Sequence, residues 1–349
     1  MQFTEILGRF QQVTEGMDGG YLALCSAHDD SRPSLRIWLG DNGKVRMTCR
    51  AGCATNDVRK AAGLRWPDMF NATGEGLRVP KERPKLVGPG QIAALASYID
   101  LAGQNLRGSG SANADIAAAY AAERFGITPG MFEDLELGLS DDDTWATLPY
   151  LSRAFLAFPR LVVPLCDFDG VPRGLQGRDL TGDCPVRWVS LMNPEGMRWA
   201  PYGVFQGAGG HGVTIVSEGL SDGLTAVAAG YDALPIRGAS LVNNPDLLAE
   251  LAAGLKDQRV IAAGDNDKSG REFNRRLAEG LKPFGIDVRA LPIPNLGPKS
   301  DLTDWRESDP AAFRNNLHSA VRQCAPVREN KAKLRRMEAL MVATLGETK

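Results

Sequence analysis

The chain reads Gly212-Val213-Thr214-Ile215-Val216-Ser217-Glu218-Gly219 past its midpoint, and Val260-Ile261-Ala262-Ala263-Gly264-Asp265-Asn266-Asp267 further along. Each stretch is a short apolar run that ends in carboxylates. In open parallel sheets, the chemistry lies at the carboxyl ends of the strands. Three acids at two neighbouring strand ends would form an oxygen-rich pocket, which suits Mg²⁺ or Mn²⁺ better than zinc.

Strands and helices alternate around these two runs from residue 211 onward. We predict strands over 213–217, 233–237, 259–264 and 287–292, and helices over 220–229, 246–254, 269–283 and 310–322. Such alternation predicts a parallel sheet with helices on its faces. The sequence has no Gly-x-x-x-x-Gly-Lys-Ser/Thr loop, so the chain carries no P-loop motor.

The acids of the two runs have a spacing that brings their side chains together. Asp222 lies one helical turn after Glu218, and Asp265 and Asp267 point the same way if the backbone between them is extended. Ordinary polar residues at strand ends are the alternative explanation. Asp301 and Asp304 follow the last predicted strand, where helix capping explains them as well as metal binding does.

A second cluster of metal-ligating residues lies near the N-terminus. Cys25 and His28 form one close pair, and Cys49 and Cys53 form another, with Gly52 allowing a tight turn. Four nitrogen and sulfur ligands in two pairs fit a closed, structural Zn²⁺ site, and chance clustering of buried cysteines is the alternative. The surrounding arginines either contact phosphates or are simply solvated; they are Arg32, Arg36, Arg46 and Arg50.

The remaining patterns divide the chain into five parts. Alternating apolar residues at 35–39 and 44–48 flank Gly40-Asp41-Asn42-Gly43, which predicts a hairpin between the two ligand pairs. The expected parts are a zinc-binding domain (1–70), a Pro- and Gly-rich linker (71–92), a helical and basic segment (93–210), the parallel-sheet domain (211–308) and a helical tail (309–349).

Composition narrows the class of protein. The chain has 349 residues, of which 43% are hydrophobic and 23% charged, as in ordinary globular proteins. A formal net charge of -2 argues against a protein that coats DNA by charge alone, but it permits a local basic groove. We expect a cytoplasmic protein without a membrane partner, because neither a signal peptide nor a long apolar stretch is visible.

The acidic motifs resemble a known domain. Glu218-Gly219-x-x-Asp222 and Asp265-x-Asp267-x-x-Gly270 resemble the TOPRIM domain of primases, topoisomerases and some nucleases. The two ligand pairs in front narrow the resemblance to DnaG-type DNA primases. The segments 160–203 and 117–139 resemble that family's basic subdomain and the helices before it. The resemblance covers roughly residues 15–310.

The resemblance implies a fold and a set of roles. The fold would be α/β multidomain: a β-rich zinc ribbon, a mixed α+β basic subdomain and a Rossmann-like TOPRIM sheet. Glu218 would be a metal-linked acid and possible general base. The other implied catalytic or magnesium-supporting residues are Asp222, Asp265, Asp267 and Asp301, with Asp304 as a neighbouring candidate, and the implied nucleotide or template contacts are Arg160, Arg178 and Arg187.

The implied activity is synthesis of short RNA primers on single-stranded DNA from NTPs, by two-metal phosphoryl transfer with Mg²⁺ or Mn²⁺ beside a structural Zn²⁺. Two alternatives stay open: a TOPRIM nuclease, and a non-catalytic module that binds single-stranded DNA. A topoisomerase would need a tyrosine nucleophile and further domains. The tail 326–349 has an apolar face, Leu334, Met337, Leu340 and Met341, which would either dock a separate helicase or cover the core.

Overall fold

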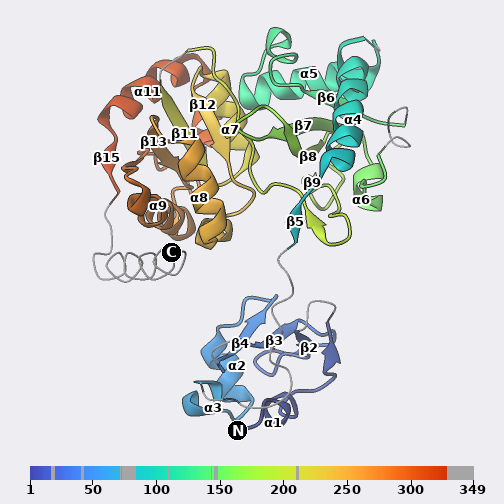
Figure 1. The fold of residues 1–349 in the computed structure, drawn as a ribbon, viewed down its shortest axis with the longest axis vertical. Helices are drawn as coiled ribbons and strands as arrows, with labels where there is room; N and C mark the ends of the chain where they lie inside the picture. Colours follow the sequence, from blue (N-terminus) through green and yellow to red (C-terminus); the bar gives the residue numbers. More distant parts are fainter. Residues whose placement is uncertain are drawn as a thin grey trace, which may run out of the picture. The chain divides into compact units, whose positions relative to one another are not determined.

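The structure is a computed structural model of the chain (Figure 1). It describes residues 1–16, 20–40, 43–70, 72, 84–108, 110–142, 144, 148–209 and 212–327. The chain divides into two units, Met1–Arg83 and Pro84–Lys349. No helix in these described ranges combines the length and the apolar character that crossing a bilayer requires.

The first unit is built on an antiparallel sheet in the order β1-β2-β3-β4. Its elements are α1 (Phe3–Leu7), β1 (Thr14–Glu15), β2 (Tyr21–Ala23), β3 (Leu35–Leu39), β4 (Val45–Cys49), α2 (Thr55–Ala61) and α3 (Trp66–Phe70). Strands β3 and β4 form the predicted hairpin, with Leu35 opposite Cys49 and Leu39 opposite Val45. Alternate residues of both strands are buried, so one face of the sheet packs on the core. Strand β4 ends at Cys49, one of the predicted zinc ligands.

The second unit begins with helices and an antiparallel sheet in the order β6-β7-β8-β9. Its helices are α4 (Pro89–Gly108), α5 (Ala112–Phe125), η1 (Pro129–Met131) and α6 (Arg153–Leu156). Its strands are β6 (Gly138–Ser140), β7 (Arg160–Cys166), β8 (Pro172–Asp179) and β9 (Trp188–Ser190), with a separate parallel pair of β5 (Lys85–Leu86) and β10 (Met197–Arg198). This is the mixed α+β segment that the sequence predicted.

The predicted linker 71–92 is too long at its C-terminal end. Strand β5 lies within it, and α4 already begins at Pro89, where a proline is well suited to a first helical turn. The main-chain N–H groups of Lys85 and Val87 donate to carbonyls of Gly196 and Arg198, so this stretch is held by the basic subdomain. Of the rest of the predicted linker, residues 71 and 73–83 lie outside the described ranges.

A five-stranded sheet in the order β12-β11-β13-β14-β15 follows, with helices on both faces (Figure 1). Its strands are β11 (Val213–Ser217), β12 (Asp232–Pro235), β13 (Arg259–Ala263), β14 (Val288–Ala290) and β15 (Ala325–Pro326). Its helices are α7 (Leu220–Ala228), η3 (Ala239–Asn243), α8 (Pro245–Gly254), α9 (Lys268–Leu281), η4 (Lys282–Phe284), α10 (Leu302–Ser308) and α11 (Pro310–Gln323). The first four strands are parallel, as predicted, and only β15 runs antiparallel.

Alternating side chains of the parallel strands supply two cores. Ile215 joins a cluster with α7, α10 and α11, whereas Val216 joins the opposite cluster with α8 and α9. The first cluster also contains Leu161 and Val163 of β7 and Phe125 of α5. The basic subdomain and the parallel sheet therefore share one close-packed core, which holds their functional side chains at fixed positions.

The predicted tail is partly integrated into the fold. Phe313, Leu317 and Val321 form a buried face of α11, because their spacing places them on one side of a helix. Ala325 and Pro326 pair with β14, so the expectation of a helix from residue 326 onward is wrong at its start. The apolar residues predicted to dock a helicase or cover the core fall in 328–349, outside the described residues.

Candidate functional site: an acidic cluster and a stacked arginine

The acids of the two quoted runs meet at one edge of the parallel sheet. Strands β11 and β13 are parallel neighbours with Ser217 opposite Ala263. Glu218 follows β11 directly, and Asp265 and Asp267 follow β13 after Gly264. From β11 the chain moves to β12 on one side and later returns to β13 on the other. The acids therefore occupy a topological switch point, where ligands of open α/β sheets bind.

Gly270 allows the loop after β13 to pack closely against helix α9. A Cβ at Gly270 would lie 2.1 Å from the main-chain oxygen of Asp265 and 2.3 Å from its nitrogen. Because nothing larger fits, the first turn of α9 can lie directly against the acidic loop. Asp267 caps this helix by accepting a 2.9 Å hydrogen bond from the Gly270 N–H. Asn266 N–H donates to Ser300 at 2.8 Å, which ties the loop to the segment before α10.

The charges of the clustered carboxylates raise one another's pKa values. Burial, with the nearby charges of Glu218, Asp301, Asp267 and Asp304, raises the pKa of Asp265 from its ordinary 3.8 to about 7. Burial and the charge of Asp267 also raise the pKa of Glu218. Its Oε2 atom is buried and has no hydrogen-bond partner in the described part of the chain. An unpartnered carboxylate oxygen among other carboxylates fits a divalent cation with oxygen ligands.

Asp222 lies behind this cluster rather than in it. Its side chain is buried, and Oδ1 accepts hydrogen bonds from the N–H and hydroxyl of Thr303, at 3.0 and 2.9 Å. Burial and the charges of Asp301 and Asp265 raise the pKa of Asp222 well above its ordinary value. Asp222 thus ties α7 to α10, and its predicted catalytic role stays a prediction.

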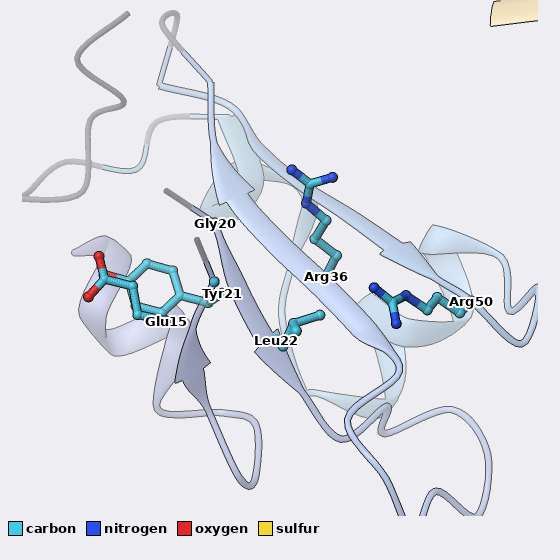
Figure 2. A pocket seen from close by; sticks show the side chains of 7 residues that line it. Glu15, Gly20, Tyr21, Leu22, Arg36 and Arg50 are labelled. Atoms are coloured by element: carbon cyan, nitrogen blue, oxygen red, sulfur yellow. The ribbon is translucent and has the colours of Figure 1, made fainter. Parts of the chain in front are cut away.

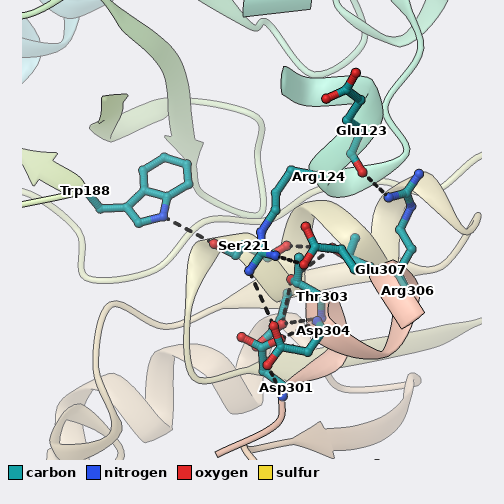
Figure 3. Close-up of polar contacts among 11 residues, drawn as sticks. Glu123, Arg124, Trp188, Ser221, Asp301, Thr303, Asp304, Arg306 and Glu307 are labelled. Atoms are coloured by element: carbon teal, nitrogen blue, oxygen red, sulfur yellow. Dashed lines mark hydrogen bonds and ion pairs between the residues drawn. The ribbon is translucent and has the colours of Figure 1, made fainter. Parts of the chain in front are cut away.

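Asp301 and Asp304 do cap a helix, and they also face the site. The Asp304 N–H donates to Asp301 Oδ1 at 2.7 Å, forming the start of α10. Burial and the charge of Asp304 raise the pKa of Asp301, whereas the nearby Arg124 lowers it. Arg124 reaches across from α5, 3.6 Å from Asp304 and in contact with Glu307 (Figure 3). Asp301 and Asp304 therefore both cap α10 and contribute negative charge to the acidic cluster.

The raised pKa of Asp265 predicts a pH-dependent response to metal. Between about pH 4 and 7 the folded protein keeps a proton that the unfolded chain has lost, so stability without metal should fall as pH rises through that range. A divalent cation must displace this proton below pH 7. Mg²⁺ or Mn²⁺ should therefore raise the unfolding temperature more at pH 8 than at pH 6, as measured by thermal denaturation. Asp265→Asn should remove most of the difference; an equal metal effect at both pH values would contradict the prediction.

Arg178 is a basic residue that is stacked against two aromatic rings. The guanidinium of Arg178, on β8, is 5.2 Å from the ring centroid of Tyr120 and 5.9 Å from that of Trp188. Burial, followed by the charges of Arg187 and Arg124, lowers the pKa of Arg178, and its buried Nε atom has no partner in the described ranges. Trp188 in turn donates from Nε1 to the Ser221 hydroxyl at 3.2 Å, next to the acids (Figure 3).

Arg187 is exposed and Arg178 is partly buried, and the contact of both with a nucleotide or template stays a prediction. Arg160 differs from both. Its side chain is fully buried, and it donates to main-chain carbonyls of Phe155, Ala154 and Gly177 at 2.9, 2.6 and 3.4 Å. The predicted nucleotide contact of Arg160 is wrong, because its guanidinium is already used to join α6 to the antiparallel sheet.

Arg160→Gln should consequently destabilise the second unit instead of weakening substrate binding alone. Leaving buried carbonyls unpaired costs about 1–3 kcal/mol each, so a loss of about 3 kcal/mol in the free energy of unfolding is expected. Urea denaturation measures it. Arg187→Gln is the matched exposed variant and should change stability by less than about 0.5 kcal/mol. Wild-type stability of Arg160→Gln would contradict the structural role.

The zinc ligands come together as predicted. The ligand atoms of Cys25, His28, Cys49 and Cys53 all lie within 4.8 Å of one another, and no other group of three or more such residues in the described chain is as compact. His28 turns Nδ1 toward the sulfur of Cys53, at 3.3 Å, while its Nε2 lies 3.7 Å from Asp30. A carboxylate behind a histidine ligand orients the ring. The donor set fits a closed structural Zn²⁺ site.

A cavity of about 470 Å³ opens on the first unit beside the sheet (Figure 2). Arg36, on β3, and Arg50, just after β4, extend toward it, and Tyr21 and Leu22 line it from β2. Arg36 also lies over the ring of Trp38, 5.4 Å from its centroid. Two of the four predicted phosphate-contacting arginines thus share one concave surface.

Three contributors to the site were not assigned a role from the sequence. Arg124 pairs with the acids of α10, while Tyr120 and Trp188 enclose Arg178. Tyr120 and Arg124 are four residues apart on α5, so the helical spacing alone could have placed both on one face. The position of Trp188 depends on pairing between β8 and β9.

Comparisons with known proteins agree with this architecture. Residues 215–307 match a family model described as Toprim-like. No curated protein matches the chain by sequence. Among solved structures, the zinc-binding and RNA polymerase domains of Aquifex aeolicus primase align over 93% of this chain and 84% of that one, with 17% identity and a TM-score of 0.52.

Two further structures share the second unit's architecture. A DnaG catalytic core aligns over 68% of this chain and 81% of its own, with 17% identity and a TM-score of 0.51. The RNA polymerase domain of Mycobacterium tuberculosis primase DnaG aligns over 69% of this chain and 82% of its own, with 20% identity and a TM-score of 0.51. The chain thus carries a Toprim-like domain and has the fold of the DnaG-type primases.

Proposed function

We propose that the chain is a DNA primase, which joins NTPs into short RNA primers on a single-stranded DNA template and releases pyrophosphate. One observation carries the proposal: an acidic cluster lies at the switch point of the parallel sheet, and Arg178 is stacked against Tyr120 and Trp188, whose indole N–H donates to Ser221, three residues after Glu218. Acids that hold divalent cations and arginines that hold phosphates are the two requirements of phosphoryl transfer.

The residues divide the work by position. Glu218, Asp265 and Asp267 would hold Mg²⁺ or Mn²⁺, which when bound would neutralise phosphate charge and activate the attacking hydroxyl. Glu218, whose pKa is raised, is also suited to accept the proton of that hydroxyl. Asp301 lies at the rim, and Asp222 supports the others from behind. Arg178 and Arg187 bind phosphates of the nucleotide or template.

Nucleic acid is the second ligand in this proposal. The related Mycobacterium tuberculosis domain was solved in complex with double-stranded DNA, which supports nucleic-acid binding by the shared fold. In the first unit, Arg36 and Arg50 face the cavity of Figure 2 and would contact template phosphates. The nearby aromatic rings of Tyr21 and Trp38 are of the type that stacks with unpaired bases.

A primer-synthesis assay tests the function directly. Purified protein, a single-stranded DNA template, labelled NTPs and Mg²⁺ or Mn²⁺ should give short RNA products, whereas omitting template or metal should give none. Cleavage of DNA without NTPs would instead identify a nuclease that uses the same acids. Template binding without any NTP incorporation, under conditions where the protein is folded and metal-loaded, would identify a non-catalytic module and overturn the proposal.

A further inference from the structure

Arg237 is a charged residue at the acidic edge of the sheet, and it has no part in the proposed function. It follows β12, which pairs with β11 so that Pro235 lies opposite Ser217. The N–H of Ile236 donates to the Ser217 carbonyl at 2.9 Å. Because the strands are parallel, Arg237 leaves the sheet at the same edge as Glu218, one strand away.

The main chain of the basic subdomain passes over this edge. Arg237 N–H donates to the Pro201 carbonyl at 2.7 Å, and its Nη2 donates to the Ala200 carbonyl at 2.8 Å. Only the second of these bonds involves the guanidinium. Its Nε atom is buried and has no hydrogen-bond partner, and no carboxylate lies within 4.0 Å of the group in the described part of the chain.

A second arginine lies close by. Arg198, half-buried, precedes Ala200 by two residues on the segment that Arg237 contacts. Burial, followed by the charge of Arg198, lowers the pKa of Arg237 to about 10. The described residues give Arg198 no acidic partner either. Two like charges close to each other are unfavourable unless an anion joins them.

We propose that Arg237 and Arg198 form a phosphate-binding site at the carboxyl edge of β12, beside the acidic cluster. Guanidinium groups bind phosphate oxygens through paired N–H donors, and a free Nε is one of the donors such a fork needs. The identity of the ligand rests on the proposed function. The bound phosphates belong either to the triphosphate of a nucleotide or to the backbone of a DNA strand.

A purely structural role is the competing explanation, since Arg237 also holds Ala200 in place. Two variants separate the explanations. Arg237→Gln removes the charge and fork, while Arg237→Lys keeps the charge. Arg259→Gln is the matched control: Arg259 also donates from Nη2 to one main-chain carbonyl, that of Val321 at 2.7 Å, but lies at the opposite end of β13.

The probes are inorganic tripolyphosphate, followed by calorimetry, and a labelled oligo-dT, followed by fluorescence anisotropy; neither requires catalysis. Arg237→Gln should weaken one of them about 10- to 100-fold, as loss of charged hydrogen bonds does. Arg237→Lys should lie between, and Arg259→Gln should bind as the wild type does. Loss in the tripolyphosphate arm assigns the site to a triphosphate, and loss confined to oligo-dT assigns it to the DNA backbone.

Unchanged affinity of Arg237→Gln for both probes would overturn the site. If that variant does not fold, Arg198→Gln takes its place, because the Arg198 side chain is only half-buried. Failure of the site and failure of the proposed function are distinguishable. If the protein makes primers but binds both probes independently of these arginines, only the phosphate-binding site is refuted. If it makes no primers but Arg237→Gln weakens the binding of a probe, only the primase proposal is refuted.

Discussion

Primer synthesis by Glu218→Gln protein is expected to fall about 1,000-fold, the size of effect seen when one preorganised charge-stabilising group is removed from an active site. Glutamine keeps the size of the side chain and removes its charge and basicity. Glu218 Oε2 is buried without a partner, and its carboxylate faces the charge of Asp267. A group in that position contributes to activity and opposes stability.

Two measurements therefore belong together for this variant. Product formation should be nearly lost, while the unfolding temperature without metal should stay the same or rise, because a repulsive buried charge has been removed. Glu272→Gln is the control: Glu272 lies on α9 of the same domain and pairs with Arg275 and Arg276 on the outer side. It should retain activity. Synthesis by Glu218→Gln within a few-fold of wild type would remove Glu218 from the catalytic group.

Removing zinc should unfold the first unit and leave the second folded. Cys25 and Cys49 are members of the first unit's core as well as ligands, so losing the metal loosens the centre of that core. Structural zinc sites contribute about 10–16 kcal/mol in small domains, which is as large as the whole stability of an ordinary domain. The second unit has its own cores and no part in the ligand set.

Limited proteolysis of the full chain with and without a chelator measures this effect. With zinc, the first unit should resist the protease; without it, residues before Arg83 should be digested while a fragment from about Pro84 survives. Cys53→Ser should behave like the chelated protein and bind less than one zinc per chain. Cys166→Ser, outside the cluster, should bind zinc as the wild type does. Equal protease resistance with and without metal would show that the unit does not depend on the ion.

Much of the fold could be predicted from local pattern. The alternation from residue 211 located all four parallel strands and their helices within a few residues, because each element carries its own apolar period. The zinc ligands were equally visible, since each pair is close in sequence and a hairpin joins them. Gly270 was part of the acidic motif, and the structure shows the Asp265 main chain against it.

Predictions from local sequence pattern were wrong where they relied on the composition of a segment and the tertiary contacts of that segment decided its structure. The segment 84–92 is rich in proline and glycine, yet β5 and α4 form there because β10 supplies a partner strand. Arg160 matched a basic position in the resembling family, yet the carbonyls around it consume its donors. Nothing in a sequence reports whether an arginine has a free side for a ligand.

The spacing of acids and ligands along the chain was enough to identify a metal-dependent α/β domain behind a zinc-binding unit, because those signals depend on neighbours within one or two elements. Which charges face each other was settled by packing between elements distant in the chain. Arg124 meets the acids of α10, Arg178 is stacked between rings from α5 and β9, and Arg237 lies one strand from Glu218. Charge interactions depend on distance and burial in three dimensions, and neither quantity can be read along a single chain.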